Sequence, residues 1–155
     1  MIVCEFENGG KGNLRHVVVH ALVIKEGKIL LVKRAPDLLE GGKWGLPGGF
    51  IDRDENAHEA VLRELLEETG WEGEIKTLFR INTNPFRKGE DRQNIVLEFL
   101  IEPIQKTGNP DKESSEIKWF SEEETKSLDF AFDHKETVEL FFEHTKKKKE
   151  LSIME

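Results

Sequence analysis

Short apolar runs separated by polar turns run through most of the chain and predict a sheet with few helices. Residues 15–24 and 28–33 are rich in Val, Ile and Leu, and Glu26-Gly27 lies between them. Two β-type runs joined by such a turn are typical of a hairpin. Three later runs have the same character and predict further strands, at residues 74–80, 93–102 and 116–120.

One long helix is predicted directly after a Gly- and Pro-rich stretch. Residues 44–49 contain too much Gly and Pro for a helix and suit a bent strand and loop. A helix over 55–69 should follow, with Asp52 or Asp54 as N-cap, Glu55 in its first turn and a glycine, residue 70, just past its end.

The C-terminal third predicts two more helices. Residues 121–127 suit a short helix, and residues 133–148 a longer one in which Val138, Phe141 and Phe142 recur at helical spacing. The lysines at 146–149 fit a solvated helix end, where cations complement the dipole. Strands and helices intermix, which predicts an α/β protein with helices on both faces of a mixed sheet.

Length and charge narrow the class of protein. With 155 residues, a single domain over 1–155 is expected. The net charge of −8 repels polyanions, so no nucleic-acid partner is expected. The apolar runs are far shorter than the roughly 20 residues that a membrane span needs, and no segment resembles a secretory signal. A lone cysteine, Cys4, excludes an intrachain disulfide and fits a cytoplasmic protein.

Three glutamates give the predicted helix its chemistry. Glu64, Glu67 and Glu68 are spaced i, i+3 and i+4, so their carboxylates share one helical face and repel one another. Solvation alone explains many acidic faces, but here lysine hardly dilutes the charge. A bound cation would relieve the repulsion. Oxygen ligands select hard ions, Mg²⁺ first and Mn²⁺ as a substitute, and Mg²⁺ readily shares substrate phosphates.

The spacing around these glutamates resembles the Nudix box. Five residues separate Gly49 from Glu55, seven more lead to Arg63, and the run Arg63-Glu64-Leu65-Leu66-Glu67-Glu68-Thr69-Gly70-Trp71 completes the motif. The preceding Gly45-Leu46-Pro47-Gly48-Gly49 and the predicted strand before Arg34 also fit the pattern of the Nudix hydrolases. The resemblance implies an α/β/α sandwich in which the box forms a loop-helix-loop against a mixed sheet.

The resemblance also implies roles for particular residues. Glu64, Glu67 and Glu68 would bind the metal, the backbone carbonyl of Gly48 would complete its ligands, and Arg63 and Glu55 would orient the acids. Catalysis would be metal-assisted attack of water on a diphosphate. The general base varies among relatives, so Glu67 and Glu68 are candidates, with Glu113 and Glu116 as alternatives from a loop.

Substrate contacts are expected from four residues. Arg34 occupies a position where relatives often bind phosphate, although a surface role is an equal alternative. The segment that contains Pro85, Phe86 and Arg92 resembles the loop of relatives that act on ADP-ribose and nucleotide sugars. Asp133 either contacts the nucleobase or caps the last helix. The histidines at 16, 20, 58 and 144 lack metal-site spacing, so ordinary surface or core roles are expected.

Three functions remain open at this level. The first is a hydrolase that cleaves the diphosphate of a nucleoside diphosphate linked to another group, ADP-ribose or a nucleotide sugar. The second is a pyrophosphatase that removes oxidised or noncanonical nucleoside triphosphates. The third is a nucleotide-binding regulatory Nudix domain without catalysis, which the intact box disfavours. Many relatives form dimers, and the sequence leaves a homodimer open.

Overall fold

The computed structural model describes residues 2–89, 92–147 and 153–154. In chain order its elements are β1 (Ile2–Glu5), β2 (Lys11–Leu14), β3 (Val17–Lys25), β4 (Lys28–Arg34), β5 (Trp44–Gly45), β6 (Gly48–Phe50), α1 (Ala57–Thr69), β7 (Trp71–Asn82), β8 (Ile95–Lys106), β9 (Ser114–Ser121), α2 (Glu122–Thr125), α3 (His134–Lys147) and β10 (Ile153–Met154). The predicted strands and helices are present. Lys148 and Lys149, assigned above to the end of the last helix, lie outside the described residues.

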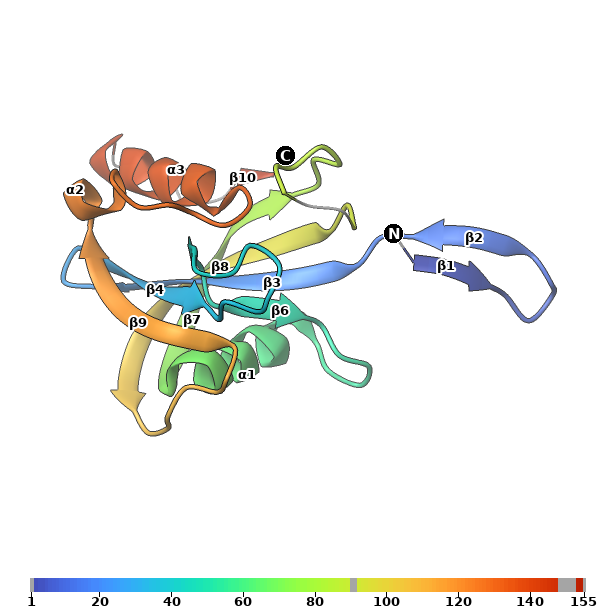
Figure 1. Ribbon diagram of the computed structural model, residues 1–155, viewed down its shortest axis with the longest axis horizontal. Helices are drawn as coiled ribbons and strands as arrows, with labels where there is room; N and C mark the ends of the chain where they lie inside the picture. Colours follow the sequence, from blue (N-terminus) through green and yellow to red (C-terminus); the bar gives the residue numbers. More distant parts are fainter. Residues whose placement is uncertain (1, 90–91, 148–152, 155) are drawn as a thin grey trace.

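Two helical layers enclose a mixed sheet. Its strands run in the order β10-β7-β8-β3-β4-β5, with β6 paired to β3 and β9 to β4. The β3–β8 pair is parallel, whereas β7–β8 and β4–β9 are antiparallel. Helix α1 covers one face, and α2 and α3 lie on the other (Figure 1). The α/β/α sandwich predicted from the sequence is confirmed.

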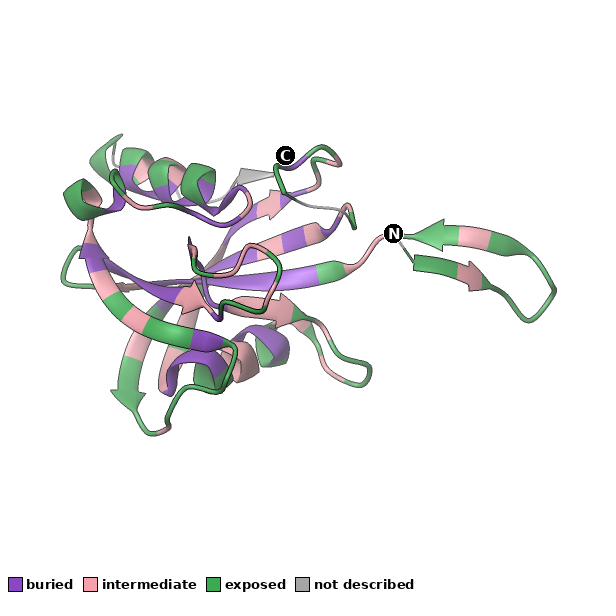
Figure 2. Cartoon of the chain, viewed as in Figure 1, coloured by how far each residue is buried: buried purple, intermediate pink, exposed green. Residues whose placement is uncertain are grey.

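Alternating side chains on the central strands build a core on each face. On β3, Val19, Ala21 and Val23 pack with Ala60, Val61 and Leu65 of α1. The opposite face of the sheet contributes Leu22, Ile29 and Leu31, which join Val138, Phe141 and Phe142 of α3. The buried residues therefore follow the sheet and the inner faces of both helices (Figure 2). The period of two along each strand fixes which residues meet which helix.

The predicted hairpin of β3 and β4 opens soon after its turn. The two strands pair only through Ile24–Ile29 and Lys25–Lys28. Beyond these pairs β3 continues against β8 and β6, while β4 continues against β9 and β5. The sheet thus splays between His20 on β3 and Arg34 at the end of β4. This divergence leaves room for a pocket at the sheet's centre.

Helix α1 begins two residues later than predicted. Its N-cap is Asn56, whose side chain accepts hydrogen bonds from the backbone N–H groups of His58 and Glu59 at 2.9 and 3.1 Å. The Glu59 carboxylate accepts in return from the Asn56 N–H at 2.8 Å. Neither Asp52 nor Asp54 is the cap, because Asn56 and Glu59 form a reciprocal capping box. The helix ends at Gly70, as predicted, in the left-handed conformation at φ 74°.

The capping box gives a prediction for stability. Replacing Asn56 with Ala removes both acceptor bonds and should lower the free energy of unfolding by about 1 kcal/mol. Urea denaturation measures the change. Asn56→Asp is the matched control and should retain most of the stability, because a carboxylate caps as well as an amide. Equal stability of the alanine and aspartate variants would contradict the role of this cap.

The N-terminal residues form a hairpin that the sequence analysis did not predict. Strands β1 and β2 pair antiparallel in a sheet of their own, and in the turn the Phe6 N–H donates to the Gly10 carbonyl oxygen at 2.8 Å. The hairpin projects from the body of the molecule (Figure 1). Val3 and Phe6 are exposed on it. Among the described residues, no helix is long and apolar enough to span a membrane.

Candidate active site

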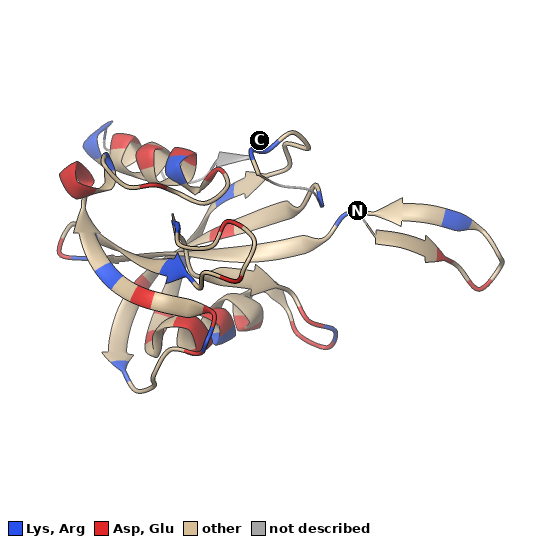
Figure 3. Cartoon of the chain, viewed as in Figure 1, with Lys and Arg blue, Asp and Glu red and all other residues tan. Residues whose placement is uncertain are grey.

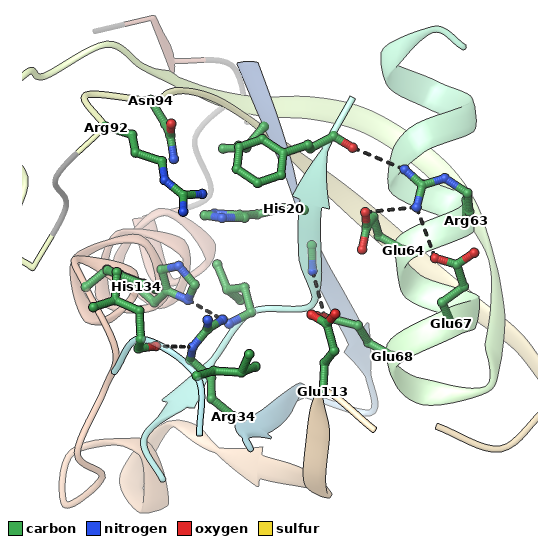
Figure 4. A pocket seen from close by; sticks show the side chains of 18 of the residues that line it. His20, Arg34, Arg63, Glu64, Glu67, Glu68, Arg92, Asn94, Glu113 and His134 are labelled. Atoms are coloured by element: carbon green, nitrogen blue, oxygen red, sulfur yellow. Dashed lines mark hydrogen bonds and ion pairs between the residues drawn. The ribbon is translucent and has the colours of Figure 1, made fainter. Parts of the chain in front are cut away.

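A pocket of about 520 Å³ opens where β3 and β4 diverge. Its walls come from β3, β6, the end of β4, helix α1, the loop before β9 and the segment before α3. Figure 4 shows the glutamates of α1 on one side of this pocket and Arg34, Arg92 and His134 on the other. Opposite charges thus lie on opposite walls. The acidic cluster is also visible on α1 in Figure 3.

The acidic wall contains the three glutamates that the sequence singled out. Glu64, Glu67 and Glu68 all line the pocket. The Arg63 guanidinium donates from Nη1 to Glu64 at 2.9 Å and to Glu67 at 3.0 Å. It also grips Glu55 through Nε and Nη2, at 3.0 and 2.7 Å. Arg63 therefore links Glu55 to two of the three glutamates on this wall.

Glu68 is the most deeply buried of the three. Its side chain accepts a hydrogen bond from the Gly48 N–H at 2.9 Å, and the residue is only 7% exposed. Burial raises the pKa of its carboxyl group to about 8, and the charges of Glu64 and Asp111 add to the effect. Burial also raises the pKa of Glu64, helped by Glu67 and Glu113. The wall thus concentrates carboxylates where ionisation is costly.

This donor set fits a hard divalent cation. It consists of oxygen atoms only, and a cation would offset the cost of holding these carboxylates ionised in a buried wall. Residues 2–89, 92–147 and 153–154 contain no ready-made cluster of three His, Cys, Asp or Glu side chains close enough to hold a metal. The reason is visible in Figure 4, where Arg63 holds Glu64 and Glu67 while Glu68 turns toward Gly48. Metal binding therefore requires these side chains to exchange partners.

Two glycines allow β6 to pack closely against β3 and against Glu64. A Cβ atom on Gly48, at φ 154°, would lie 2.1 Å from the Val19 carbonyl oxygen. A Cβ atom on Gly49 would lie 2.4 Å from Oε1 of Glu64. Both positions need glycine for close approach. The Gly48 N–H donates to Glu68, whereas the sequence led us to expect a metal contact from the Gly48 carbonyl.

The loop before β9 supplies two further acids. Asp111 and Glu113 line the pocket, and the Asp111 N–H donates to the Glu67 carbonyl oxygen at 2.9 Å. Glu113 is therefore where a loop base was predicted. Glu116 is not, because β9 carries it away from the pocket to pair with Lys33 at 3.8 Å. Asp111 was missed, since nothing in the sequence distinguishes it from other loop acids.

The opposite wall is basic and aromatic. Arg34 donates from Nε to the Leu39 carbonyl oxygen at 2.8 Å, and its guanidinium lies over Phe132 at 5.2 Å. Arg92 lies over Phe50 at 5.5 Å. Both arginines line the pocket. A guanidinium held by an aromatic ring stays oriented toward an anionic ligand.

Asp133 does not line this pocket. It forms a buried ion pair with Arg87, with 2.7 Å between Arg87 Nε and Asp133 Oδ2, and also accepts from Asn82 at 2.9 Å. Burial tends to raise the pKa of Asp133, but the hydrogen bond and charge of Arg87 lower it below its ordinary value. The described contacts of this carboxylate thus support neither a base contact nor a helix cap. It is Arg87 that reaches the pocket.

Phe86 also lies outside the pocket. Its side chain is 86% exposed in the loop after β7, because the Asn84 side chain accepts from the Phe86 N–H and turns the chain outward. The Phe86→Ala variant should therefore change KM less than twofold and leave stability within about 0.5 kcal/mol. Steady-state kinetics measure this. A rise in KM of tenfold or more would return Phe86 to the substrate-binding residues.

Two buried histidines on the pocket floor were missed by sequence reasoning. His20 and His134 line the pocket, and their rings meet edge to face with centroids 4.5 Å apart. His134 Nδ1 accepts a hydrogen bond from the Leu46 N–H at 2.9 Å. Burial is the main cause that lowers both pKa values, to about 3 for His20. His20 and His134 come from different ends of the chain, so spacing gave no signal for them.

Comparison with known proteins places this site in a family. The NUDIX domain model matches residues 14–141. An ADP-ribose pyrophosphatase of Methanocaldococcus jannaschii is 32% identical over 123 residues, which cover 79% of this chain and 70% of that protein. A CTP pyrophosphohydrolase of Escherichia coli is 40% identical over 58 residues, 37% of this chain and 43% of that protein. The similarity thus extends to relatives with different named substrates.

Solved structures share the fold. A NUDIX hydrolase from Nitrosomonas europaea superposes with a TM-score of 0.79 at 23% identity, over 99% of this chain and 91% of that one. A bifunctional NMN adenylyltransferase/ADP ribose pyrophosphatase from Francisella tularensis, crystallised with AMP and a manganese ion, gives 0.68 at 25% identity. That match covers 86% of this chain and 42% of the other. By the family match and the M. jannaschii relative together, the chain belongs to the NUDIX domain family.

Proposed function

We propose that this protein is a divalent-metal-dependent pyrophosphohydrolase whose substrate is a nucleoside diphosphate linked to a sugar, such as ADP-ribose. The observation that carries the proposal is the charge division of the pocket, with carboxylates on α1 facing Arg34 and Arg92 across it. A bound diphosphate would contact both walls of the pocket. Cations held by the acids and guanidinium groups on the other side would share its negative charge.

Glu64, Glu67 and Glu68 are the proposed metal ligands, with Mg²⁺ as the ion and Mn²⁺ as its substitute. When bound, the ion supplies charge neutralisation for the diphosphate and activation of the attacking water. Arg63 and Glu55 orient the acids, and Arg34 and Arg92 bind phosphate oxygens. Arg63 now balances the charge of Glu64 and Glu67, so it holds the wall together until a cation takes over that role.

The base that accepts the water's proton is one of the pocket carboxylates. Glu67 and Glu68 remain candidates from α1, and Glu113 is the loop candidate that lines the pocket. Water adds its oxygen to one phosphorus, the P–O bond to the other phosphate breaks, and the base takes up the proton. For ADP-ribose the products are AMP and ribose 5-phosphate. Basic and aromatic groups opposite the acids would bind and orient both ends of the substrate.

A substrate panel tests this function. ADP-ribose, a UDP-sugar, CTP and 8-oxo-dGTP would each be incubated with the protein and MgCl₂, and the products separated by ion-exchange chromatography. We expect two monophosphate products from a nucleotide sugar at a kcat/KM at least tenfold above that for any triphosphate. Turnover of triphosphates to monophosphate and pyrophosphate, without cleavage of nucleotide sugars, would instead support a pyrophosphatase for oxidised or noncanonical nucleoside triphosphates. Hydrolysis in H₂¹⁸O identifies the phosphorus that is attacked.

A further inference from the structure

His20 lies at the centre of the pocket floor. Figure 4 shows its ring reaching in from β3 between Arg92 and His134. His20 is the register partner of Gly48 in the β3–β6 pair, and a Cβ atom on Gly48 would lie 2.9 Å from Cδ2 of His20. Because Nε2 is bonded to Cδ2, that edge of the ring lies beside the glycine whose N–H binds Glu68. If a diphosphate binds at the acidic wall, a group attached to that diphosphate would lie next to His20.

The other edge of the ring faces a buried acceptor. His20 Nδ1 is 3.9 Å from Oε1 of Glu98, and both side chains are buried. That oxygen accepts the hydroxyl proton of Thr137 at 2.8 Å, and Thr137 accepts in turn from Arg80 at 2.9 Å. Oε1 therefore presents lone pairs and no proton to His20. At 3.9 Å the pair forms no hydrogen bond, and Nδ1 has no hydrogen-bond partner among the described residues. The nearby carboxylate oxygen favours hydrogen on Nδ1 through its charge, which leaves a lone pair on Nε2.

The ring is also held neutral and in place. Burial, followed by the positive charge of Arg87, lowers the pKa of His20 to about 3. His134 packs against it edge to face, and His134 is itself fixed by the Leu46 N–H on its Nδ1. A Cβ atom on Gly45 would lie 2.8 Å from that same Nδ1. Neutral His20 thus offers an acceptor on a wall where Arg34, Arg87 and Arg92 are donors.

An acceptor at this position separates two classes of substrate. Ionised phosphate oxygens are acceptors only, so they gain nothing from the lone pair of Nε2. A sugar hydroxyl can donate to it. In a nucleotide sugar, both groups next to the diphosphate are sugars, whereas in a triphosphate one of them is a third phosphate. A buried polar group that matches a hydroxyl discriminates against ligands that lack it.

We propose that His20 is a specificity-determining residue, whose Nε2 accepts a hydrogen bond from a hydroxyl of the sugar on the distal phosphate. This selects a nucleoside diphosphate joined to a sugar over a nucleoside triphosphate. The inference rests on the proposed function and identifies His20 Nε2 as the group that recognises the distal sugar of the substrate. His134 is a positioning residue that acts through His20.

Binding of a substrate series tests the proposal without turnover. The ligands are ADP-ribose with a methylene bridge in place of the diphosphate oxygen, and its analogues that each lack one hydroxyl of the distal ribose. Calorimetry with the wild-type protein and MgCl₂ should show one analogue binding about 5- to 20-fold more weakly, the effect of one buried hydrogen bond. In His20→Phe, intact and deoxy ligands should bind within twofold of each other. His20→Gln, which retains an acceptor oxygen, should restore part of the difference.

The control is His58→Phe, an exposed histidine of α1 outside the pocket, which should bind like the wild type. Thermal melts establish that each variant is folded. A folded His20→Phe that keeps the wild-type discrimination would overturn the proposal. If that variant does not fold, the wild-type series still decides, because equal affinity for every distal deoxy analogue, or an effect confined to the nucleoside ribose, would overturn it. Failure of the proposed function looks different: the wild type would then cleave triphosphates and no nucleotide sugar.

Discussion

The Glu68→Gln variant should lose at least about 10³-fold in kcat with little change in fold. Removing a ligand charge from a phosphoryl-transfer site costs several kcal/mol of transition-state stabilisation, and each 1.4 kcal/mol is about tenfold in rate. Glutamine keeps an oxygen that can accept the Gly48 N–H, so the local geometry should survive. Steady-state kinetics on the best substrate of the panel, with MgCl₂, measure the loss.

A stability measurement separates this chemical role from a structural one. The carboxyl pKa of Glu68 is raised to about 8 in the folded protein, so folding disfavours its ionised form. That penalty is absent below the unfolded-state pKa near 4.5 and grows as pH rises toward 8. Without metal at pH 8, Glu68→Gln should therefore melt on the order of 5 °C above the wild type. The control Glu143→Gln, on the exposed face of α3, should match the wild type in both assays. A variant that is less stable and fully active would contradict the assignment.

The Arg87→Met variant should be destabilised by about 3–5 kcal/mol, because it leaves the Asp133 carboxylate buried without its cation. The sign of its pH dependence follows from the pKa of Asp133, which Arg87 lowers. Without Arg87, ionised Asp133 is disfavoured, so the destabilisation should be larger at pH 8 than at pH 5. Chemical denaturation at the two pH values measures both effects.

Two matched variants sharpen that experiment. Arg53→Met breaks an ion pair with Asp54 that is almost fully exposed, at 3.5 Å, and should cost less than about 0.5 kcal/mol. The double variant Arg87→Met/Asp133→Asn removes both charges and should recover much of the lost stability. If Arg87→Met and Arg53→Met cost the same, the buried pair does not stabilise the fold as the structure indicates.

Helix α1 could be predicted from the sequence because its signals are local. The i, i+3, i+4 spacing of the glutamates and the glycine after Thr69 depend only on helix geometry. The predicted N-cap was wrong because Asp52, Asp54 and Asn56 are all suitable residue types. In the structure, Asn56 and Glu59 form the reciprocal capping box. Asp52 has Glu55 at the same spacing, and the Glu55 carboxylate accepts from the Asp52 N–H at 2.7 Å, so the spacing alone does not distinguish the two positions.

The pocket floor could not be predicted because it forms only when distant strands and helices meet. His20 comes from β3, Arg87 from the loop after β7, and His134 from the start of α3. No motif joins them, and each residue taken alone fits an ordinary core or surface role. Asp133 shows the opposite case. Its segment resembles one that contacts the nucleobase in relatives, but its carboxylate forms a buried ion pair with Arg87, which no sequence spacing indicates.

The N-terminal hairpin was missed for a different reason. Its residues 2–5 and 11–14 mix apolar and polar types without clean alternation, because neither face is buried against the body. The Asn8-Gly9 pair was nonetheless a turn signal between them. Gly9 takes φ 78° in that turn, a conformation that favours glycine.

The most direct test of the proposed metal site is the anomalous difference map of crystals grown with MnCl₂. A manganese peak is expected at the acidic wall, coordinated by Glu64, Glu67 and Glu68, with the Arg63 guanidinium withdrawn from Glu64 and Glu67. A map without manganese at these carboxylates, while Arg63 still bridges Glu64 and Glu67, would contradict the proposed site.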